Sequence, residues 1–346
     1  MTTRDAIARL LEGQSLSEAE TAEVIGEVMD GAATPAQVGA LLVLLRRKGE
    51  TVEELVGAAR AMRAKVTPIR FGGAGVLDTC GTGGDRSGTF NISTAAALVA
   101  AAAGCTVAKH GNRAISGAVG GADVLERLGV RIDLEPAESE AMLQETHFAF
   151  LFAPLLHGAM RYAAGPRREL AVRTIFNLLG PLTNPAGARH HLLGVFDASW
   201  VEPLARVLGR LGSVHALVVH GDDGLDEITT TAATEAAELK GGQVQRLRLE
   251  PEAFGFRRSR PEDLKVASAE DSARVIGRVL AGQVGPARDI VLLNAGAAIY
   301  AADLVPAIAA GIERARQAID GGGARALLDR VVRASQRQDA GAAGSA

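Results

Sequence analysis

The first 66 residues place apolar side chains at the three- and four-residue spacing of amphipathic helices. Ser17 to Glu20, Thr34 to Gln37 and Thr51 to Glu54 each have the spacing of a capping box, which closes the start of a helix. An apolar stripe runs along residues 22–29 on one helical face. We therefore expect only helices in this part of the chain.

The helix expected at residues 38–45 is apolar almost all the way round. Because a helix that faces water keeps a polar side, this one must be covered on several sides, by the core or by a second subunit. The sequence predicts a homodimer that associates through the N-terminal helices. If no such dimer forms, the helix must be interior.

After Gly75 the pattern changes to short β-rich runs that alternate with helical stretches. The expected strands are residues 76–79, 106–109, 148–152, 192–196 and 215–220. The expected helices include residues 94–103, 120–128, 200–211 and 268–280. This alternation is typical of a mostly parallel sheet with helices on its faces, in which ligands bind beyond the carboxyl ends of the strands.

The predicted fold class is therefore α/β: a small helical domain plus a large α/β domain with a mostly parallel central sheet flanked by helices. Residues 1–70 form the predicted helical domain, and residues 165–188 are expected to be partly helical and to pack back onto it. The predicted α/β domain comprises residues 71–164 and 189–336, and residues 337–346 are small and polar, as in a flexible tail.

Composition narrows the class of protein. The chain has 346 residues and is 47% hydrophobic, so it can bury a sizeable core. A net charge of −3 argues against nucleic-acid and membrane partners, and the longest apolar runs, such as residues 95–104, are too short to span a bilayer. Two cysteines without metal spacing, and a charged N-terminus without a signal-peptide core, predict a cytoplasmic protein.

A glycine-rich loop is the first candidate site. Residues 78–85 (DTCGTGGD) end the first expected strand, and residues 89–94 (TFNIST) place hydroxyls at the start of the next helix. Glycines let backbone N–H groups converge on an anion, and a hydroxyl-capped helix start is a natural phosphate site. Each piece alone also fits an ordinary turn and cap, but their combination favours phosphate. The loop is neither a dinucleotide fingerprint nor a Walker loop.

A second group of donors follows the second expected strand. Residues 109–113 (KHGNR) combine a lysine, an amide and an arginine within five positions. The chain has only five lysines against 32 arginines, so a lysine in a loop is conspicuous. The group fits phosphate binding, although solvated basic residues would give the same pattern.

Acidic residues gather after the last expected strand, in residues 220–227 (HGDDGLDE). Adjacent carboxylates after a glycine turn can bind Mg²⁺ and leave its remaining positions to substrate phosphates. A hairpin turn can carry the same acids without any metal. Opposite a phosphate site, however, an unneutralised acidic pair would repel the ligand, and a metal ion resolves that conflict.

The fourth candidate segment is rich in arginine. It runs through residues 157–161 (HGAMR) and 167–185, where an arginine among apolar groups can bind a planar carboxylate with two parallel hydrogen bonds. A basic helix surface is the alternative. The chain has no G-x-S-x-G elbow and no H-E-x-x-H motif, so serine-hydrolase and zinc-protease chemistry find no support.

These four motifs, in this order and spacing, resemble those of the anthranilate phosphoribosyltransferase family. The resemblance covers roughly residues 10–335 and rests on GTGGD at 81–85, NIST at 91–94, KHGNR at 109–113, RTIFNLLGPLTNP at 173–185 and GLDEITTT at 224–231. It implies a magnesium-dependent pentosyltransferase of tryptophan biosynthesis. Such an enzyme joins anthranilate to 5-phosphoribosyl 1-diphosphate (PRPP) and releases diphosphate and N-(5-phosphoribosyl)anthranilate. It also implies a nucleoside-phosphorylase-type fold, usually dimeric through the helices.

Carried over by position, the resemblance assigns three groups of site residues. For PRPP it implies Gly81, Gly84, Asp85, Thr89, Asn91, Ile92, Ser93, Thr94, Lys109, His110, Gly111, Asn112, Arg113, Ala114, Ile115, Ser116, Gly117 and Gly121. For anthranilate it implies Gly81, Asn112 and Arg167. For magnesium, expected as two ions with the diphosphate, it implies Ser93, Asp226 and Glu227.

Some positions depart from the family pattern. Many members have serine at the positions of Val119 and Gly121, where a hydroxyl can face a phosphate. Gly158 replaces a frequent proline, and Gly165 and Pro166 alter the approach to Arg167. The acceptor channel is therefore less firmly predicted than the sugar site.

The expected chemistry needs charge stabilisation more than proton transfer. Cleavage of the C1–diphosphate bond has oxocarbenium character, so Mg²⁺, loop amides and Lys109 would stabilise the departing diphosphate. The arylamine is neutral at pH 7 and needs positioning, so no obligatory general base is expected.

Two other functions remain open on sequence grounds. A pyrimidine nucleoside phosphorylase shares the fold, but it would need an inorganic-phosphate site and would not need Asp226 and Glu227 for magnesium. A relative that has lost activity and binds nucleic acid is the other alternative. The acidic pI near 6.2 and the intact motifs argue against it.

Overall fold

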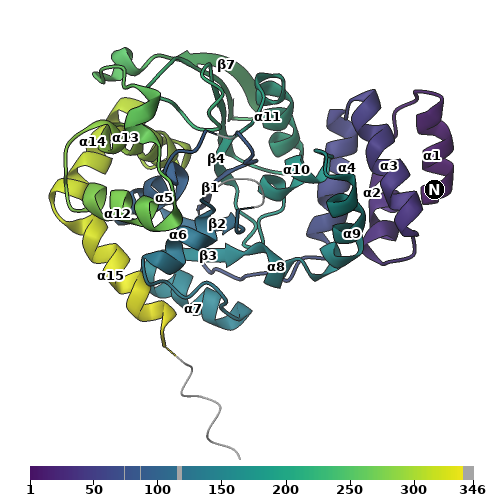
Figure 1. Cartoon of the computed structure of the whole chain (residues 1–346), viewed down its shortest axis with the longest axis horizontal. Helices are drawn as coiled ribbons and strands as arrows, with labels where there is room; N and C mark the ends of the chain where they lie inside the picture. The colour runs from purple at the N-terminus through teal and green to yellow at the C-terminus, as the bar shows by residue number, and fades with distance from the viewer. Residues whose placement is uncertain (74, 86, 115–118, 338–346) are drawn as a thin grey trace, which may run out of the picture.

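The computed structural model describes residues 1–73, 75–85, 87–114 and 119–337. A bundle of helices lies at one end of the molecule, and a sheet covered by helices forms the rest (Figure 1). The arrowheads of the parallel strands point toward the bundle. The observed architecture confirms the predicted fold class.

The N-terminal bundle is built from α1 (Thr3–Leu11), α2 (Glu18–Met29), α3 (Pro35–Lys48) and α4 (Val52–Arg63). All four begin with a capping box, including the three predicted ones. Each box satisfies backbone N–H groups that have no partner within the helix, and each fixes where its helix begins.

The apolar helix α3 is covered largely within its own chain. Its apolar positions Val38, Leu41, Leu42 and Leu45 are at most 1% exposed, and α1 and α9 (Arg161–Leu170) pack against it. Only one large apolar side chain of α3, Val43, is strongly exposed, at 42%. Most of its apolar surface is therefore interior.

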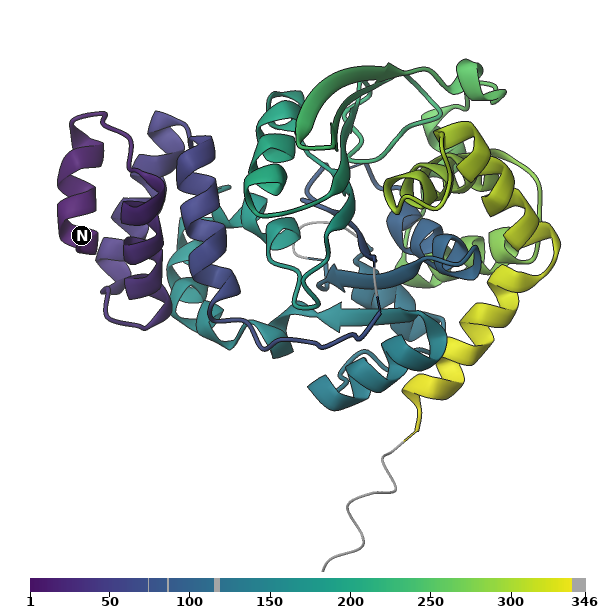
Figure 2. The same ribbon diagram turned by 180° about the vertical axis from the view of Figure 1, so that it is seen from behind.

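The sheet has seven strands in the order β3-β2-β1-β4-β5-β6-β7. The parallel part consists of β1 (Val76–Gly81), β2 (Thr106–Gly111), β3 (Phe148–Phe152), β4 (His190–Gly194) and β5 (His215–Gly221). The remaining two strands, β6 (Thr234–Lys240) and β7 (Gln243–Leu249), pair antiparallel and form the long hairpin drawn in green in Figure 2. The sequence analysis did not predict this hairpin.

Helices cover both faces of the sheet and create two large cores, and a smaller apolar cluster lies around β3. One core lies under α5 (Ile92–Ala102), α13 (Pro286–Ala301), α14 (Ile308–Asp320) and α15 (Gly323–Ser335). The other joins the sheet through α11 (Val201–Arg210) to α4 and the bundle. The other helices are α6 (Gly121–Arg127), α7 (Pro136–Thr146), α8 (Ala153–Leu156), α10 (Phe176–Leu179) and α12 (Ala269–Leu280).

Small residues let the helices of the larger core approach closely. Helix α5 is mostly alanine and is buried nearly all round. Where α13 crosses α14, a side chain on Gly296 or Gly311 would collide with the backbone of the other helix. None of the described helices is both long and apolar enough to cross a membrane.

Candidate active site

A cleft of about 1180 Å³ opens beyond the carboxyl ends of β1 and β2. One wall comes from the strand ends and the start of α5, and the other from α9 and the segment that follows it. The predicted residues that line it are Gly81, Gly84, Asp85, Thr89, Asn91, Ile92, Ser93, Lys109, His110, Gly111, Asn112, Arg113, Ala114, Gly121, Arg167, Asp226 and Glu227. Thr94 lies buried behind this surface, and Ile115, Ser116 and Gly117 fall outside the described residues.

The glycine loop allows a close approach between β1 and the acidic turn. A Cβ on Gly81 would lie 2.7 Å from Asp226 Oδ2, so any larger residue there would push the carboxylate away. The backbone N–H of Gly83 donates to the same oxygen at 2.8 Å. Gly83 and Gly84 have φ of 67° and 81°, values that glycine adopts without steric cost. The Gly83 amide therefore ties the glycine loop to the acidic turn.

The acidic pair carries negative charge that the surrounding protein does not balance. Burial, together with the nearby Asp85 carboxylate, raises the pKa of Asp226 to about 7. Burial, and then the charge of Asp226, raises the pKa of Glu227 to about 8, while Lys109 lowers it in part. Because both pKa values are raised, ionising these two carboxyl groups in the folded protein costs free energy unless a cation binds beside them.

The donor set fits magnesium. Carboxylate oxygens and the hydroxyl of Ser93 are hard ligands, and Mg²⁺ commonly takes one or two carboxylates and fills the rest with water and phosphate. Within the described residues, no three His, Cys, Asp or Glu side chains are grouped to hold a metal by themselves. A metal bound here would therefore share its coordination with a substrate.

Helix α5 begins at the cleft with a cap made by its own sequence. The N-cap residue Asn91 accepts hydrogen bonds through Oδ1 from Thr94 N at 3.0 Å and from Ser93 Oγ at 3.3 Å. The start of the helix concentrates partial positive charge, which favours an anion. Thr94 Oγ1 is buried at the back of this wall and has no hydrogen-bond partner among the residues that the structure describes.

Lys109 lies inside β2, which extends two residues beyond the predicted strand end at Lys109. Strand β2 continues through Gly111, so Lys109 sits within it and is only 3% exposed. Its Nζ donates to Thr79 O and, at 3.0 Å, to Ser93 Oγ. Burial lowers the pKa of the ammonium, whereas nearby Cys80, Asp78 and the acidic pair raise it. The lysine therefore joins β1 and β2 to the start of α5.

Two buried histidines lie under the same wall. His110 Nδ1 is 3.0 Å from Gly180 O, and its Nε2 is 3.1 Å from Nε2 of His157. Burial lowers the pKa of His110 to about 3 and that of His157 to about 4. Both rings are neutral at pH 7, so neither adds positive charge for a phosphate.

Comparison with known proteins identifies the family to which this chain is similar. The glycosyl transferase family models match twice, with the helical bundle domain over residues 4–66 and the α/β domain over residues 73–325. The chain is 54% identical to anthranilate phosphoribosyltransferase of Thioalkalivibrio sulfidiphilus, over 96% of this chain and 98% of the relative. It is 52% identical to that of Methylococcus capsulatus, over 97% and 99%.

The chain belongs to the anthranilate phosphoribosyltransferase family. The crystal structure of the enzyme from Thermus thermophilus has a TM-score of 0.91 at 44% identity, covering 96% of this chain and all of that chain. The Saccharomyces cerevisiae enzyme in complex with PRPP and Mg has a TM-score of 0.87 at 25% identity, covering 96% and 97%. The family membership confirms the predicted resemblance.

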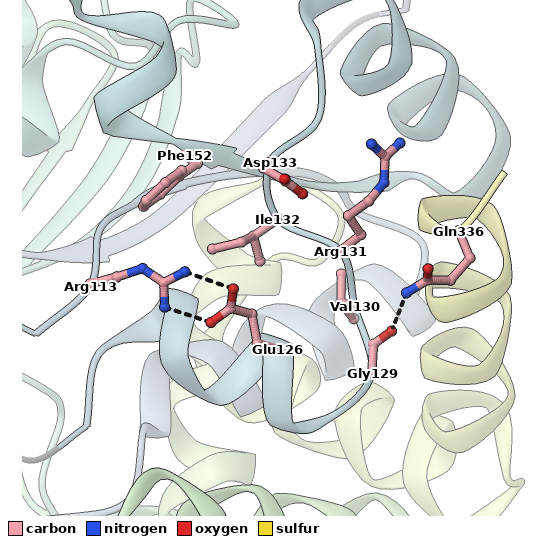
Figure 3. Close-up of a pocket in the computed structure, with 9 residues that line it drawn as sticks. All are labelled: Arg113, Glu126, Gly129, Val130, Arg131, Ile132, Asp133, Phe152 and Gln336. Atoms are coloured by element: carbon pink, nitrogen blue, oxygen red, sulfur yellow. Dashed lines mark hydrogen bonds and ion pairs between the residues drawn. The ribbon is translucent and has the colours of Figure 1, made fainter. Parts of the chain in front are cut away.

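Arg113, a family-assigned PRPP residue, points away from the glycine loop. Its guanidinium forms two hydrogen bonds with Glu126, at 2.5 and 2.7 Å, and lies 5.7 Å from the ring centre of Phe152 (Figure 3). Asp123 accepts a third hydrogen bond at 3.1 Å. Arg113, Glu126 and Phe152 border a smaller pocket of about 330 Å³, and Arg113 lines the main cleft as well.

Arg167, the anthranilate residue implied by the family, lies on α9 with its guanidinium 5.2 Å from the ring centre of Phe176. Burial lowers the pKa of this arginine. Pro166 lies inside α9 and is buried, so the unusual approach to Arg167 is accommodated within a helix.

Among the cleft residues that were not predicted as site residues, three polar ones come from the arginine-rich segment: Arg168, Arg173 and Asn177. Arg173 stacks 3.8 Å from the ring centre of Phe196 and donates to Gly84 O, which ties the glycine loop to the opposite wall. These residues lie inside the arginine-rich segment 167–185, and its position beside the glycine loop could not be read from spacing.

Proposed function

We propose that this chain transfers the phosphoribosyl group of PRPP to the amine of anthranilate, which releases diphosphate and gives N-(5-phosphoribosyl)anthranilate for L-tryptophan biosynthesis. The observation that carries this proposal is the meeting of a glycine loop, a helix start and an unbalanced acidic pair in one cleft. Relatives more than 50% identical along nearly the whole chain bear the name of this activity.

The proposed PRPP site is the strand-end wall of the cleft. Backbone amides of the glycine loop and of the α5 start would bind the phosphates, because preorganised N–H groups stabilise anionic oxygens. The buried ammonium of Lys109 supplies fixed positive charge behind Ser93. The other PRPP residues in this proposal are the ones that the family resemblance implies, of which Gly81 is the first in the chain and Gly121 the last.

The proposed metal ligands are Ser93, Asp226 and Glu227, and two Mg²⁺ ions are proposed with the diphosphate. When bound, magnesium neutralises the diphosphate and favours its departure. The raised pKa values of the two carboxyl groups support this assignment, since a divalent cation would remove the cost of ionising them.

The proposed anthranilate site is the opposite wall, with Asn112 and Gly81 at its edge. Arg167 would bind the carboxylate of the aromatic acid, and the apolar surroundings of its guanidinium would strengthen that contact. The arylamine is already neutral, so the wall needs to orient its nitrogen toward C1 of the ribose and to exclude water. No general base is assigned. The neutral rings of His110 and His157 are hydrogen-bonded to each other and have a structural role beneath the cleft.

A homodimer through the N-terminal helices is part of the proposal. Leu11 at the end of α1 and Val43 on α3 are apolar and 66% and 42% exposed, which supports contact with a second copy. Sedimentation at micromolar concentration tests it, and a monomer would contradict it. The cytoplasmic location and the boundaries of the two domains remain predictions.

One assay tests the proposed reaction. Anthranilate is fluorescent, so its consumption can be followed continuously in the presence of PRPP, with and without Mg²⁺. We expect fluorescence to fall only when both PRPP and Mg²⁺ are present. Inorganic phosphate with a pyrimidine nucleoside serves as the control pair, and turnover of that pair without anthranilate consumption would contradict the proposal.

A further inference from the structure

Asn294, in the middle of α13, forms hydrogen bonds with the backbone that directly follows the acidic pair. Its side chain is fully buried, and it does not line the cleft. Oδ1 accepts from Ile228 N at 3.0 Å, and Nδ2 donates to Ile228 O at 2.7 Å. Ile228 is the next residue after Glu227 and is also fully buried. One side chain therefore holds both polar backbone groups of a single residue.

The carboxamide is suited to this contact because it presents an acceptor and a donor side by side. The second N–H of Nδ2 is also used, since it donates to Ile290 O at 2.9 Å within α13. An aspartate would place an oxygen against two carbonyl oxygens, and an apolar side chain would leave buried backbone groups unpaired. An apolar side chain would remove the whole contact, whereas an aspartate would keep only the bond from Ile228 N, and each change leaves buried polar groups without a partner.

The helix that carries Asn294 is firmly placed. Helix α13 packs along α5 and crosses α14 at the close contact between Gly296 and Gly311. Helix α5 begins at the cleft with Ser93, the hydroxyl proposed as a metal ligand. Through α13, Asn294 therefore links the backbone that follows Glu227 to the helical layer beside α5, in addition to the hydrogen bond that the Glu227 carboxylate accepts from the Ser93 backbone.

Other contacts organise the acidic turn internally. Asp223 Oδ2 accepts from Thr229 Oγ1 at 2.7 Å and from Thr231 Oγ1, and its Oδ1 accepts from Leu225 N at 3.2 Å. These bonds shape the turn, but they do not connect it to α5 or α13. The Asn294 contact makes that connection from the helical layer.

A connection of this kind matters because the two carboxylates repel each other. Asp226 and Glu227 are adjacent in the chain, and like charges at this distance repel each other whenever both groups are ionised. Without restraint, the two carboxylates would lower their energy by moving toward water. The turn would then leave the position at which these carboxylates can share a cation with a diphosphate. The hydrogen bonds between Asn294 and the backbone of Ile228 oppose that movement without adding charge.

We infer that Asn294 is a positioning residue for the divalent cation: it holds the acidic pair where the metal is shared with the diphosphate of PRPP. The inference rests on the proposed function, which assigns the metal to Asp226 and Glu227. Groups that orient metal ligands from outside the coordination shell typically contribute roughly 10- to 100-fold to metal affinity or activity.

The test compares Asn294→Ala and Asn294→Asp with Leu328→Ala, which removes a buried apolar side chain of α15 outside the cleft. Binding of Mn²⁺ is measured with and without PRPP, through the loss of the electron paramagnetic resonance signal of free Mn²⁺. Backbone hydrogen exchange of residues 224–231 is measured in the metal-free protein. Steady-state rates give the Mg²⁺ concentration for half-maximal activity and the KM for anthranilate.

We expect both Asn294 variants to bind Mn²⁺ in the presence of PRPP roughly 10- to 100-fold more weakly and to raise the half-saturating Mg²⁺ concentration similarly. Exchange within residues 224–231 should accelerate before any metal is added, and the KM for anthranilate should stay unchanged. Leu328→Ala should lower thermal stability and leave Mn²⁺ binding as it is. Because Asn294→Asp keeps the acceptor for Ile228 N, it remains testable even if Asn294→Ala fails to fold.

Two results would overturn the inference. One is an Asn294 variant with unchanged Mn²⁺ binding and unchanged exchange in residues 224–231. The other is a Leu328→Ala variant that loses Mn²⁺ binding to the same degree, which would show that general destabilisation is the cause. The proposed function is tested separately: if Asp226→Ala with Glu227→Ala retains Mn²⁺ binding, the metal assignment itself fails, whatever the Asn294 variants do.

Discussion

The two walls of the cleft are built in different ways. The strand-end wall uses backbone amides, a buried lysine and two acids, each fixed by strands, helix starts or long-range hydrogen bonds. The opposite wall uses arginine side chains from α9 and the following segment, lying on aromatic rings. The first wall suits a ligand with concentrated negative charge, and the second suits a flat molecule with one carboxylate. If this contrast is right, each wall can be damaged while the other substrate is spared.

The largest effect is expected from removing the acidic pair. Asp226→Ala with Glu227→Ala should reduce Mg²⁺-dependent turnover by a factor on the order of 10³ or more, because several kcal/mol of charge stabilisation would be lost. Steady-state rates at saturating substrates measure this, and circular dichroism checks the fold. Asp222→Ala is the control, since that acid lies in the same turn but pairs with Arg248 at 2.6 Å. A double variant that keeps its Mg²⁺-dependent rate would contradict the metal assignment.

Loss of the buried lysine should harm only the strand-end wall. Lys109→Met keeps most of the side-chain volume but removes a charge-assisted contact, worth about 1.5–3 kcal/mol, so the KM for PRPP should rise roughly 10- to 150-fold. The KM for anthranilate should change little. Lys265→Met, at an exposed position, is the matched control. An equal rise in both KM values would mean that the lysine supports the whole cleft rather than one wall.

The acidic pair also predicts how stability depends on pH. The pKa values of Asp226 and Glu227 are raised in the folded protein, so the folded state binds more protons than the unfolded chain up to about pH 8. Stability contributed by this pair is therefore lost as the pH rises toward and through those values. Thermal melting of metal-free protein should show a Tm that falls with rising pH up to about pH 8, and the contribution of this pair should level off above that pH. Asp226→Asn with Glu227→Gln should flatten that slope, and an unchanged slope would contradict the raised pKa values.

The smallest effect is expected at Gly121. A Cβ there would lie 3.5 Å from Thr94 Oγ1 and 3.6 Å from Phe150, which is ordinary contact, so serine fits. Gly121→Ser adds the hydroxyl that many family members carry, and one neutral hydrogen bond of about 0.5–1.5 kcal/mol should lower the KM for PRPP roughly 2- to 12-fold. Gly121→Ala is the control for the added bulk. If alanine matches serine, the hydroxyl does not reach a phosphate.

The sequence predicted much of the strand-end wall because its motifs are local. The expected parallel strands are short β-rich runs, and the cap at Asn91 is encoded within four residues. The β6–β7 hairpin was missed because its strands mix alanine, glutamate and arginine, although Gly241 and Gly242 between them are a recognisable turn signal.

Sequence patterns did not predict the contacts between segments that lie far apart in the chain. The burial of Lys109 depends on Thr79 and Ser93, and the direction of Arg113 depends on Glu126 in the next helix. Asn294 lies inside an apolar helix, where nothing local indicates that it binds Ile228, 66 residues earlier in the chain. These positions are determined by packing, which spacing does not record.

The most direct test of the contrast between the walls is the pair of KM values for Arg167→Ala. Arg161→Ala is the control, because that exposed arginine lies on the same helix and stacks on Tyr162 outside the cleft. Arg167→Ala should raise the KM for anthranilate roughly 10- to 150-fold, through loss of a charge-assisted contact, and should leave the KM for PRPP nearly unchanged. A variant that impairs PRPP and spares anthranilate would contradict the assignment of α9 to the aromatic acid.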